Sequence, residues 1–149
     1  RALVRSRGLG DVYKRQLESV SEAIFSTINV SSVTTLATGG IYDSVPQDVS
    51  YPFIWFTIDE SDVAGTFGLI MKRCRIRVHA FSQYRGNEEA QKILNAAVNV
   101  LRYQTPTVSN HTSLLLTHEG SSGLPDEDIN GVQTKHLVAD FELIVQEDS

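Results

Sequence analysis

The segment from Lys72 to Ser82 alternates between two kinds of side chain, and this pattern constrains the fold more than any other feature of the chain. Alternation with a period of two is typical of a strand that packs one face on a core. One set of side chains comprises Cys74, Ile76, Val78 and Ala80, and the opposite set comprises Arg73, Arg75, Arg77 and His79. The segment is therefore predicted to be a strand whose first set faces inward.

Other segments predict the rest of a sheet. The apolar run Phe53–Ile58 indicates a strand covered on both faces, and Ile41-Tyr42 allows a short strand. Residues 59–70 are expected to be a long hairpin connection that contains Gly65 and Gly68. Two later strands are expected at Ser113–Glu119 and Lys135–Gln146, joined by an exposed acidic loop over residues 120–132.

Two segments have helical spacing. Apolar residues recur at three- and four-residue steps in Leu17–Asn29 and again in Glu88–Leu101. The stripe of the second helix is expected to be buried and consists of Ala90, Ile93, Leu94, Ala97, Val98 and Leu101. The 149 residues fit one domain. We predict a single α+β domain over residues 17–149, with a largely antiparallel sheet of about four to five strands and two helices packed on one face.

The basic segment over residues 1–16 differs from the acidic remainder of the chain. Its second half, GLGDVYKRQ, resembles a translated linker end found fused to reading frames in environmental assemblies. We therefore expect a non-native or disordered leader and assign it no function. The alternative is a basic arm that binds DNA or an anionic surface.

No motif in the chain predicts catalysis, a cofactor or a metal. The sequence has no glycine-rich phosphate loop in a strand-to-helix context, no GxSxG elbow and no HExxH pair. Its four histidines do not have the spacing of metal ligands, and we expect them to be separate. The single cysteine, Cys74, is expected to be a buried, unreactive thiol. The net charge of −5 does not favour wrapping nucleic acid, and no apolar run is long enough to span a bilayer.

One set of charged residues has two possible roles. Arg73, Arg75 and Arg77 are predicted on the sheet face away from the helices, together with Asp140 and Glu142. They could form cross-strand ion pairs within one subunit, each contributing about 0.2–1 kcal/mol. They could instead form an electrostatic seam between identical subunits. The apolar second face of Phe53–Ile58, which includes Trp55, slightly favours a buried interface.

The order of the segments resembles that of the phage tail completion and tail terminator family. The resemblance rests on a sequence of features along the chain: the opening amphipathic helix, Gly39-Gly40-Ile41-Tyr42-Asp43, Val45-Pro46-Gln47, Tyr51-Pro52-Phe53-Ile54, the acidic Asp59-Glu60-Ser61, the strand Arg75–Phe81 and the helix Glu88–Leu101. No single piece is specific, and the order carries the likeness.

The resemblance implies a structural virion protein rather than an enzyme. It implies an oligomeric ring, expected to be a hexamer, that caps the tail tube, ends tube polymerisation and joins the tail to the head connector. Its partners would be further copies of the chain, the tube protein and the connector, with DNA passing through the bore and no membrane involved. It would act at the head-tail junction of the virion after assembly in the bacterial cytoplasm. Another neck role, as a connector or stopper, is an alternative, and a small ligand-binding domain is a more distant one.

The connection Ser61–Ile70 is expected to dock on the tube or the connector. It is long and combines glycines with apolar side chains that are expected to be exposed. The candidate docking residues are Asp62, Gly65, Phe67, Gly68 and Leu69.

Overall fold

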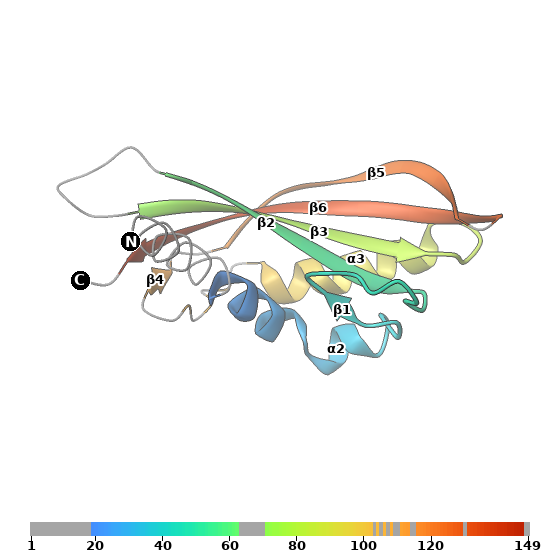
Figure 1. Cartoon of the computed structure of the whole chain (residues 1–149), viewed down its shortest axis with the longest axis horizontal. Helices are drawn as coiled ribbons and strands as arrows, with labels where there is room; N and C mark the ends of the chain where they lie inside the picture. The colour runs from blue at the N-terminus through green and yellow to red at the C-terminus, as the bar shows by residue number, and fades with distance from the viewer. Residues whose placement is uncertain are drawn as a thin grey trace, which may run out of the picture.

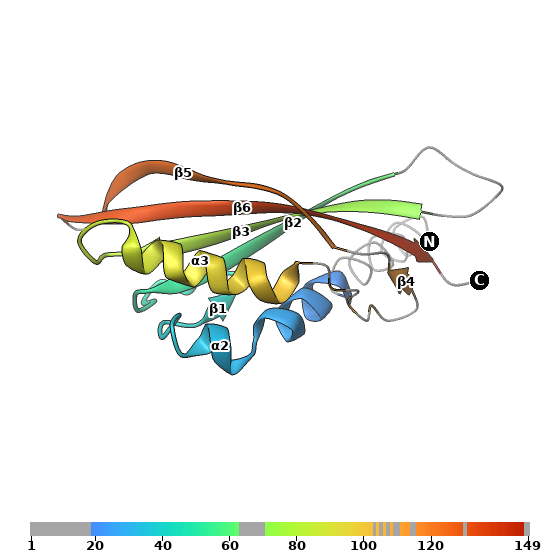
Figure 2. The ribbon, with the colours of Figure 1, turned by 180° about the vertical axis from the view of Figure 1, so that it is seen from behind.

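The structure is a computed structural model that describes residues 19–62, 71–102, 104, 106, 108, 111–113, 116–129 and 131–147. Long strands form one strongly twisted sheet, and the helices lie together on one of its faces (Figure 1). Seen from behind, α3 runs along the sheet, and the shorter helical segments lie together on one side of it (Figure 2). The other sheet face, called the outer face below, has no helix over it among the described residues.

The sheet contains β1 (Ile41–Tyr42), β2 (Phe53–Asp62), β3 (Met71–Ser82), β4 (His111–Ser113), β5 (Thr117–Ile129) and β6 (Val132–Glu147). Its main path has the order β1-β2-β3-β6-β4, and β5 pairs along β6 beside β4. All pairings are antiparallel except the short β1–β2 contact. The predicted α+β class and largely antiparallel sheet are confirmed.

The helical layer consists of residues 19–28, α2 (Ser31–Thr34) and α3 (Glu88–Leu101). The first segment and α3 are the two predicted helices, and α3 has the predicted bounds. All six residues of its predicted stripe are buried. The first turn of α3 carries Glu88 and Glu89, where the positive end of the helix dipole stabilises carboxylates. The short helix α2 was not predicted, because its β-branched Val33 and Thr34 are poor helix formers.

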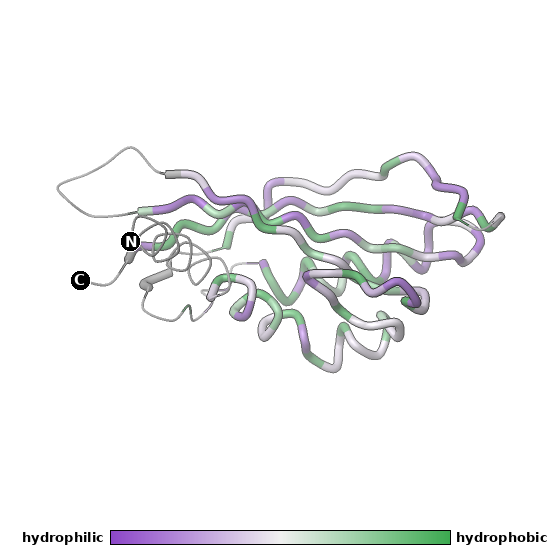
Figure 3. The backbone as a smooth tube through the Cα atoms, viewed as in Figure 1, coloured by the Kyte–Doolittle hydropathy of each residue, from purple (hydrophilic) through white to green (hydrophobic). Residues whose placement is uncertain are grey.

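The core lies between the sheet and the helices. The inward residues of β3 are at most 1% exposed, as the alternating pattern predicts. They meet the buried Ile54 and Phe56 of β2 and the inward residues of β6, of which Ala139, Phe141, Leu143 and Val145 are buried and Leu137 is partly buried. The alternation of hydrophilic and hydrophobic residues along the central strands is visible in Figure 3. The sheet therefore presents one apolar face to the helices, and its more polar face is the outer face.

The predicted end of the β2 strand was wrong. β2 continues past Ile58 to Asp62, so Asp59-Glu60-Ser61 belong to the strand and not to a turn. The basic residues of β3 explain this extension, because Asp59 lies opposite Arg75 and Asp62 opposite Lys72 in the register. Lys72 Nζ also lies 2.6 Å from Glu60 Oε1. Opposite charges on neighbouring strands thus stabilise a stretch that appears turn-like when considered alone.

The prediction for residues 113–132 also needs correction. The expected strand Ser113–Glu119 is divided, because β4 ends at Ser113 and β5 begins at Thr117. Between them, the N–H of Leu116 donates to the carbonyl of Gln104. The expected acidic loop is largely β5, which pairs with β6 as far as Ile129 opposite Val132. Most of β5 is exposed on both faces, so its sequence shows no alternation from which a strand could be predicted.

Candidate functional site

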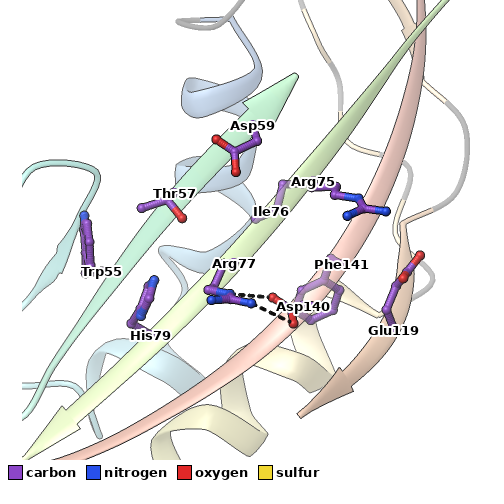
Figure 4. A pocket seen from close by; sticks show the side chains of 10 residues that line it. All are labelled: Trp55, Thr57, Asp59, Arg75, Ile76, Arg77, His79, Glu119, Asp140 and Phe141. Carbon is purple, nitrogen blue, oxygen red and sulfur yellow. Dashed lines mark hydrogen bonds and ion pairs between the residues drawn. The ribbon is translucent and has the colours of Figure 1, made fainter. Parts of the chain in front are cut away.

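The outer face carries a groove with a volume of about 530 Å³. The lining residues come from β2, β3, β5 and β6: Trp55, Thr57, Asp59, Arg75, Ile76, Arg77, His79, Glu119, Asp140 and Phe141. Figure 4 shows that the rings of Trp55 and His79 lie at one end, while the charged side chains, with Phe141 beside Asp140, lie along the rest. The groove therefore has an aromatic part and a charged part.

Ion pairs within the chain occupy part of the charged region. Arg77 and Asp140 are opposite each other on β3 and β6, with Arg77 Nε 2.8 Å from Asp140 Oδ1. This hydrogen bond raises the pKa of the Arg77 guanidinium. Outside the groove lining but on the same face, Arg73 Nε lies 3.3 Å from Glu142 Oε1. Both pairs are partly exposed, so each contributes only about 0.2–1 kcal/mol to folding.

Other charges in the groove have no ion-pair partner within 4 Å among the described residues. They are Arg75, Asp59 and Glu119, and all three are exposed. Of these, only Arg75 was identified from the sequence. Asp59 was assigned to the hairpin connection over residues 59–70 and Glu119 to the end of a different strand, so neither was expected in the groove. Unpaired charges beside paired ones are available to a binding partner.

All six residues predicted for a subunit interface lie on the outer face. The structure brings together Arg73, Arg75, Arg77, Asp140, Glu142 and Trp55 as the strand pattern predicts. Two of the three arginines, Arg73 and Arg77, form ion pairs within the subunit, which is one of the two roles predicted from the sequence. The role of this face between subunits stays a prediction.

The aromatic part of the outer face is a continuous set of stacked rings. Phe53 stacks on Phe81 with centroids 4.8 Å apart, and Phe81 stacks on His136 at 4.1 Å. Trp55 stacks on His79 at 4.4 Å, and its indole N–H donates to the carbonyl oxygen of Asp43. Phe53, Phe81 and both histidines are at most 8% exposed. This part of the outer face is therefore a second, smaller packed layer.

The expectation that the four histidines are separate was wrong for two of them. His79 Nδ1 and His136 Nε2 lie 2.7 Å apart and share a hydrogen bond. His136 Nδ1 lies 3.4 Å from Glu127 Oε1, and this carboxylate favours a proton on Nδ1, which leaves Nε2 to accept from His79. The two residues are 57 positions apart, so sequence spacing could not indicate the pair.

The histidine pair is held in the neutral form. Burial, followed by the neighbouring His136 and Arg77, lowers the pKa of His79 to about 4. Burial also lowers the pKa of His136, although the carboxylate of Glu127 acts in the opposite direction. The pair therefore packs as two neutral rings near neutral pH and resists protonation.

The predicted docking residues Gly65, Phe67, Gly68 and Leu69 lie outside the described residues. Asp62 is the last residue of β2 and lies opposite Lys72 in the register. The expected leader over residues 1–16 also lies outside the described part of the chain.

Among the described residues, the structure shows a buried thiol and no cluster of metal ligands. Cys74 is fully buried, and burial, reinforced by Glu60, raises the pKa of its thiol to about 11. Within the described ranges, no group of three or more His, Cys, Asp or Glu side chains could hold a metal ion. No helix in these ranges has the length and apolar character needed to cross a membrane.

Comparison with known proteins gives the family. The family described as "Tail completion protein gp17" matches residues 22–146, which is most of the chain. The chain belongs to this family. It is thus a structural protein of the phage tail, in agreement with the resemblance found in the sequence.

A solved structure shares the fold of this tail completion protein. A chain from a structure titled "Virion of native gene transfer agent (GTA) particle" aligns with a TM-score of 0.71 and 13% sequence identity. The alignment covers 83% of this chain and 91% of the other. No curated protein matches the sequence significantly.

Proposed function

We propose that this tail completion protein caps the end of the phage tail tube as a ring of identical subunits, a hexamer. The ring ends polymerisation of the tube and forms the joint to the head connector, at the head-tail junction of the virion. The observation that carries the proposal is the family match over residues 22–146. The likeness of the fold to a chain of a gene transfer agent virion supports a place in a virion particle.

The composition of the outer face supports the proposed contacts between subunits. It has no covering helix among the described residues, and its groove holds Arg75, Asp59 and Glu119 without ion-pair partners there. A ring closes by head-to-tail contacts, in which two different surfaces of each subunit meet. Unpaired charges of both signs can be matched by opposite charges on a neighbour and thereby set the register of the contact.

The remaining partners follow from the same assembly. The subunit carries a net charge of −5, and a net negative ring lets DNA pass through its bore without binding it. The connection between β2 and β3, with Asp62, Gly65, Phe67, Gly68 and Leu69, is proposed to contact the tube or the connector. No membrane takes part in this assembly.

Reversal of the unpaired charge at position 75 is expected to weaken the ring. Native mass spectrometry of the full chain, alone and mixed with the tube protein from the same genome, is expected to show a six-fold species. Arg75→Glu is expected to lower the affinity between subunits about tenfold or more, equivalent to about 1.4 kcal/mol, since it places like charges at the seam. Its monomer should lose only about 1 kcal/mol of stability, because position 75 is exposed, although the new glutamate faces Asp59 and Glu142 in the register.

Arg85→Glu is the matched control, because Arg85 is also exposed but lies in the turn before α3, away from the groove. This variant should assemble like the parent chain. Equal assembly of both variants would show that the charged groove plays no part in the contact between subunits.

A further inference from the structure

The edge of the sheet at β2 is mostly open. β1 pairs with β2 only at Ile54 and Trp55, although β2 continues to Asp62. Asp43, the residue after β1, accepts a hydrogen bond from the indole N–H of Trp55 through its carbonyl oxygen. Beyond this contact, β2 continues from Thr57 to Asp62. Over this stretch, no described residue pairs with this edge.

The backbone alternation shows which groups are free at this edge. The N–H of Ile54 points toward β1 and donates to the carbonyl of Gly40 at 3.0 Å. Successive residues of a strand point their N–H and C=O groups to opposite edges, so Ile58 and Glu60 direct theirs to the open edge. The side chains of Thr57 and Asp59 lie on the outer face, in the groove. The open edge thus combines unpaired backbone groups with part of the groove lining.

At the opposite edge of the sheet, formed by β5, no described residue pairs with the side of β5 that faces away from β6. Two register shifts with β6 delimit a regular stretch from Gly120 to Leu124. Charged side chains and prolines commonly protect sheet edges from pairing with other chains. The stretch Gly120–Leu124 contains neither. The alternation of backbone direction can be followed from Ile54 across the paired residues of β3 and β6 to β5. It shows that Ser121 and Gly123 direct their N–H and C=O groups away from β6, toward the open edge.

The two open edges lie at opposite ends of one row of paired residues that crosses the sheet. Thr57 of β2 is opposite Arg77 of β3, which is opposite Asp140 of β6, which in turn is opposite Gly120 of β5. Each step is antiparallel, so β2 and β5 of one subunit run in opposite directions. A rotation about an axis along the strands brings β5 of one subunit beside β2 of the next in antiparallel orientation.

We propose that β5 of one subunit adds to the open edge of β2 in the neighbouring subunit, so that the sheet continues across each seam of the ring. This inference rests on the proposed ring. Ile58 pairs with Gly123 and Glu60 with Ser121, each by exchange of backbone hydrogen bonds. Asp59 then lies opposite Ser122 on the outer face, where the serine hydroxyl can donate to the carboxylate.

Charge favours this head-to-tail pairing over the symmetric one. Two copies of the β2 edge paired around Asp59 would bring this acid of one subunit close to the same acid of the other, which is repulsive. The acidic end of β5, with Asp126 and Asp128, would meet the same repulsion at β2. The neutral stretch Gly120–Leu124 adds neither charge nor bulk beside the acids. The neutral β5 stretch of a second copy of this chain is therefore the compatible partner for the β2 edge.

A mixture of two single-site variants tests the seam. Asp59→Cys and Ser122→Cys, one of them isotope-labelled, are mixed, assembled with the tube protein and oxidised mildly. Since each variant carries one new cysteine, a mixed disulfide joins two subunits, and the buried Cys74 does not react. In the proposed register, the two Cα atoms form a non-hydrogen-bonded pair ~4.5 Å apart, within reach of a disulfide. The mixed disulfide should be about tenfold more abundant than in a control with Gln91→Cys, an exposed residue of α3, in place of Ser122→Cys.

Ser121→Pro provides a second measurement. Proline is tolerated on edge strands where the lost N–H faces outward, so this variant should fold but lose the six-fold species. A six-fold species with no mixed disulfide above the control would overturn the seam and leave the ring intact. Absence of any ring on the tube would overturn the proposed function, and the seam with it.

Discussion

Gly39→Ala is expected to lower the free energy of unfolding by about 3 kcal/mol or more. A Cβ atom at position 39 would lie 1.7 Å from the carbonyl oxygen of Ser50 and 2.6 Å from that of Pro52. Both are backbone atoms, so the chain before β2 would have to move. This movement would also break the hydrogen bond from the N–H of Gly39 to the carbonyl of Pro52. Gly39 thus has a packing role in Gly39-Gly40-Ile41-Tyr42-Asp43, one of the segments on which the family resemblance rests.

Urea unfolding followed by circular dichroism measures this effect, and Gly86→Ala is the control. Gly86 has a positive φ of 76°, but a Cβ atom there would meet no other atom within 4 Å. Its replacement should cost only about 1 kcal/mol, the penalty of a left-handed conformation. Equal stability of both variants would contradict the close approach at Gly39.

Lowering the pH from 7.5 to 5 is expected to destabilise the protein by about 2 kcal/mol through His79. In the unfolded chain His79 titrates near its ordinary pKa of 6.5, whereas in the folded chain its pKa is about 4. Between these values the unfolded state binds more protons, so stability falls as the pH falls. The stabilising effect of the neutral ring is complete above the unfolded pKa and lost by about pH 4.

Urea unfolding at the two pH values separates His79 from other groups. His79→Gln should be less stable than the parent at pH 7.5 and should lose at least about half of the pH-dependent difference. His118→Gln, which changes a half-buried histidine on β5, should retain the full difference. A parent chain with equal stability at pH 7.5 and pH 5 would show that His79 is not held neutral in the folded protein.

The sequence predicts elements whose pattern arises from one-sided burial. β3 alternates because its inward residues pack on helices and its outward residues do not, and α3 shows its buried stripe for the same reason. β5 was missed because an edge strand exposed on both faces has no such pattern. The long extension of β2 was missed because Lys72 and Arg75, on another strand, stabilise its acidic end.

The outer face was predictable in part. The alternation places Arg73, Arg75 and Arg77 on one side of β3 and Asp140 and Glu142 on the same side of β6, without fixing the register. Once Arg77 is aligned with Asp140, the register brings Phe81 opposite His136, and His79 is then near it. The histidine pair could thus have been found from the charge pairs. The groove itself depends on β5, so the sequence could not predict it.

The central claim is that this protein stops growth of the tail tube, and a tube assembly experiment tests it most directly. Purified tube protein from the same genome is polymerised with and without the full chain, and tube lengths and ends are measured by electron microscopy. We predict that substoichiometric amounts of the protein shorten the tubes and that a ring is visible at one end of each. Tubes of unchanged length with bare ends, at a concentration where the protein is folded, would contradict the account.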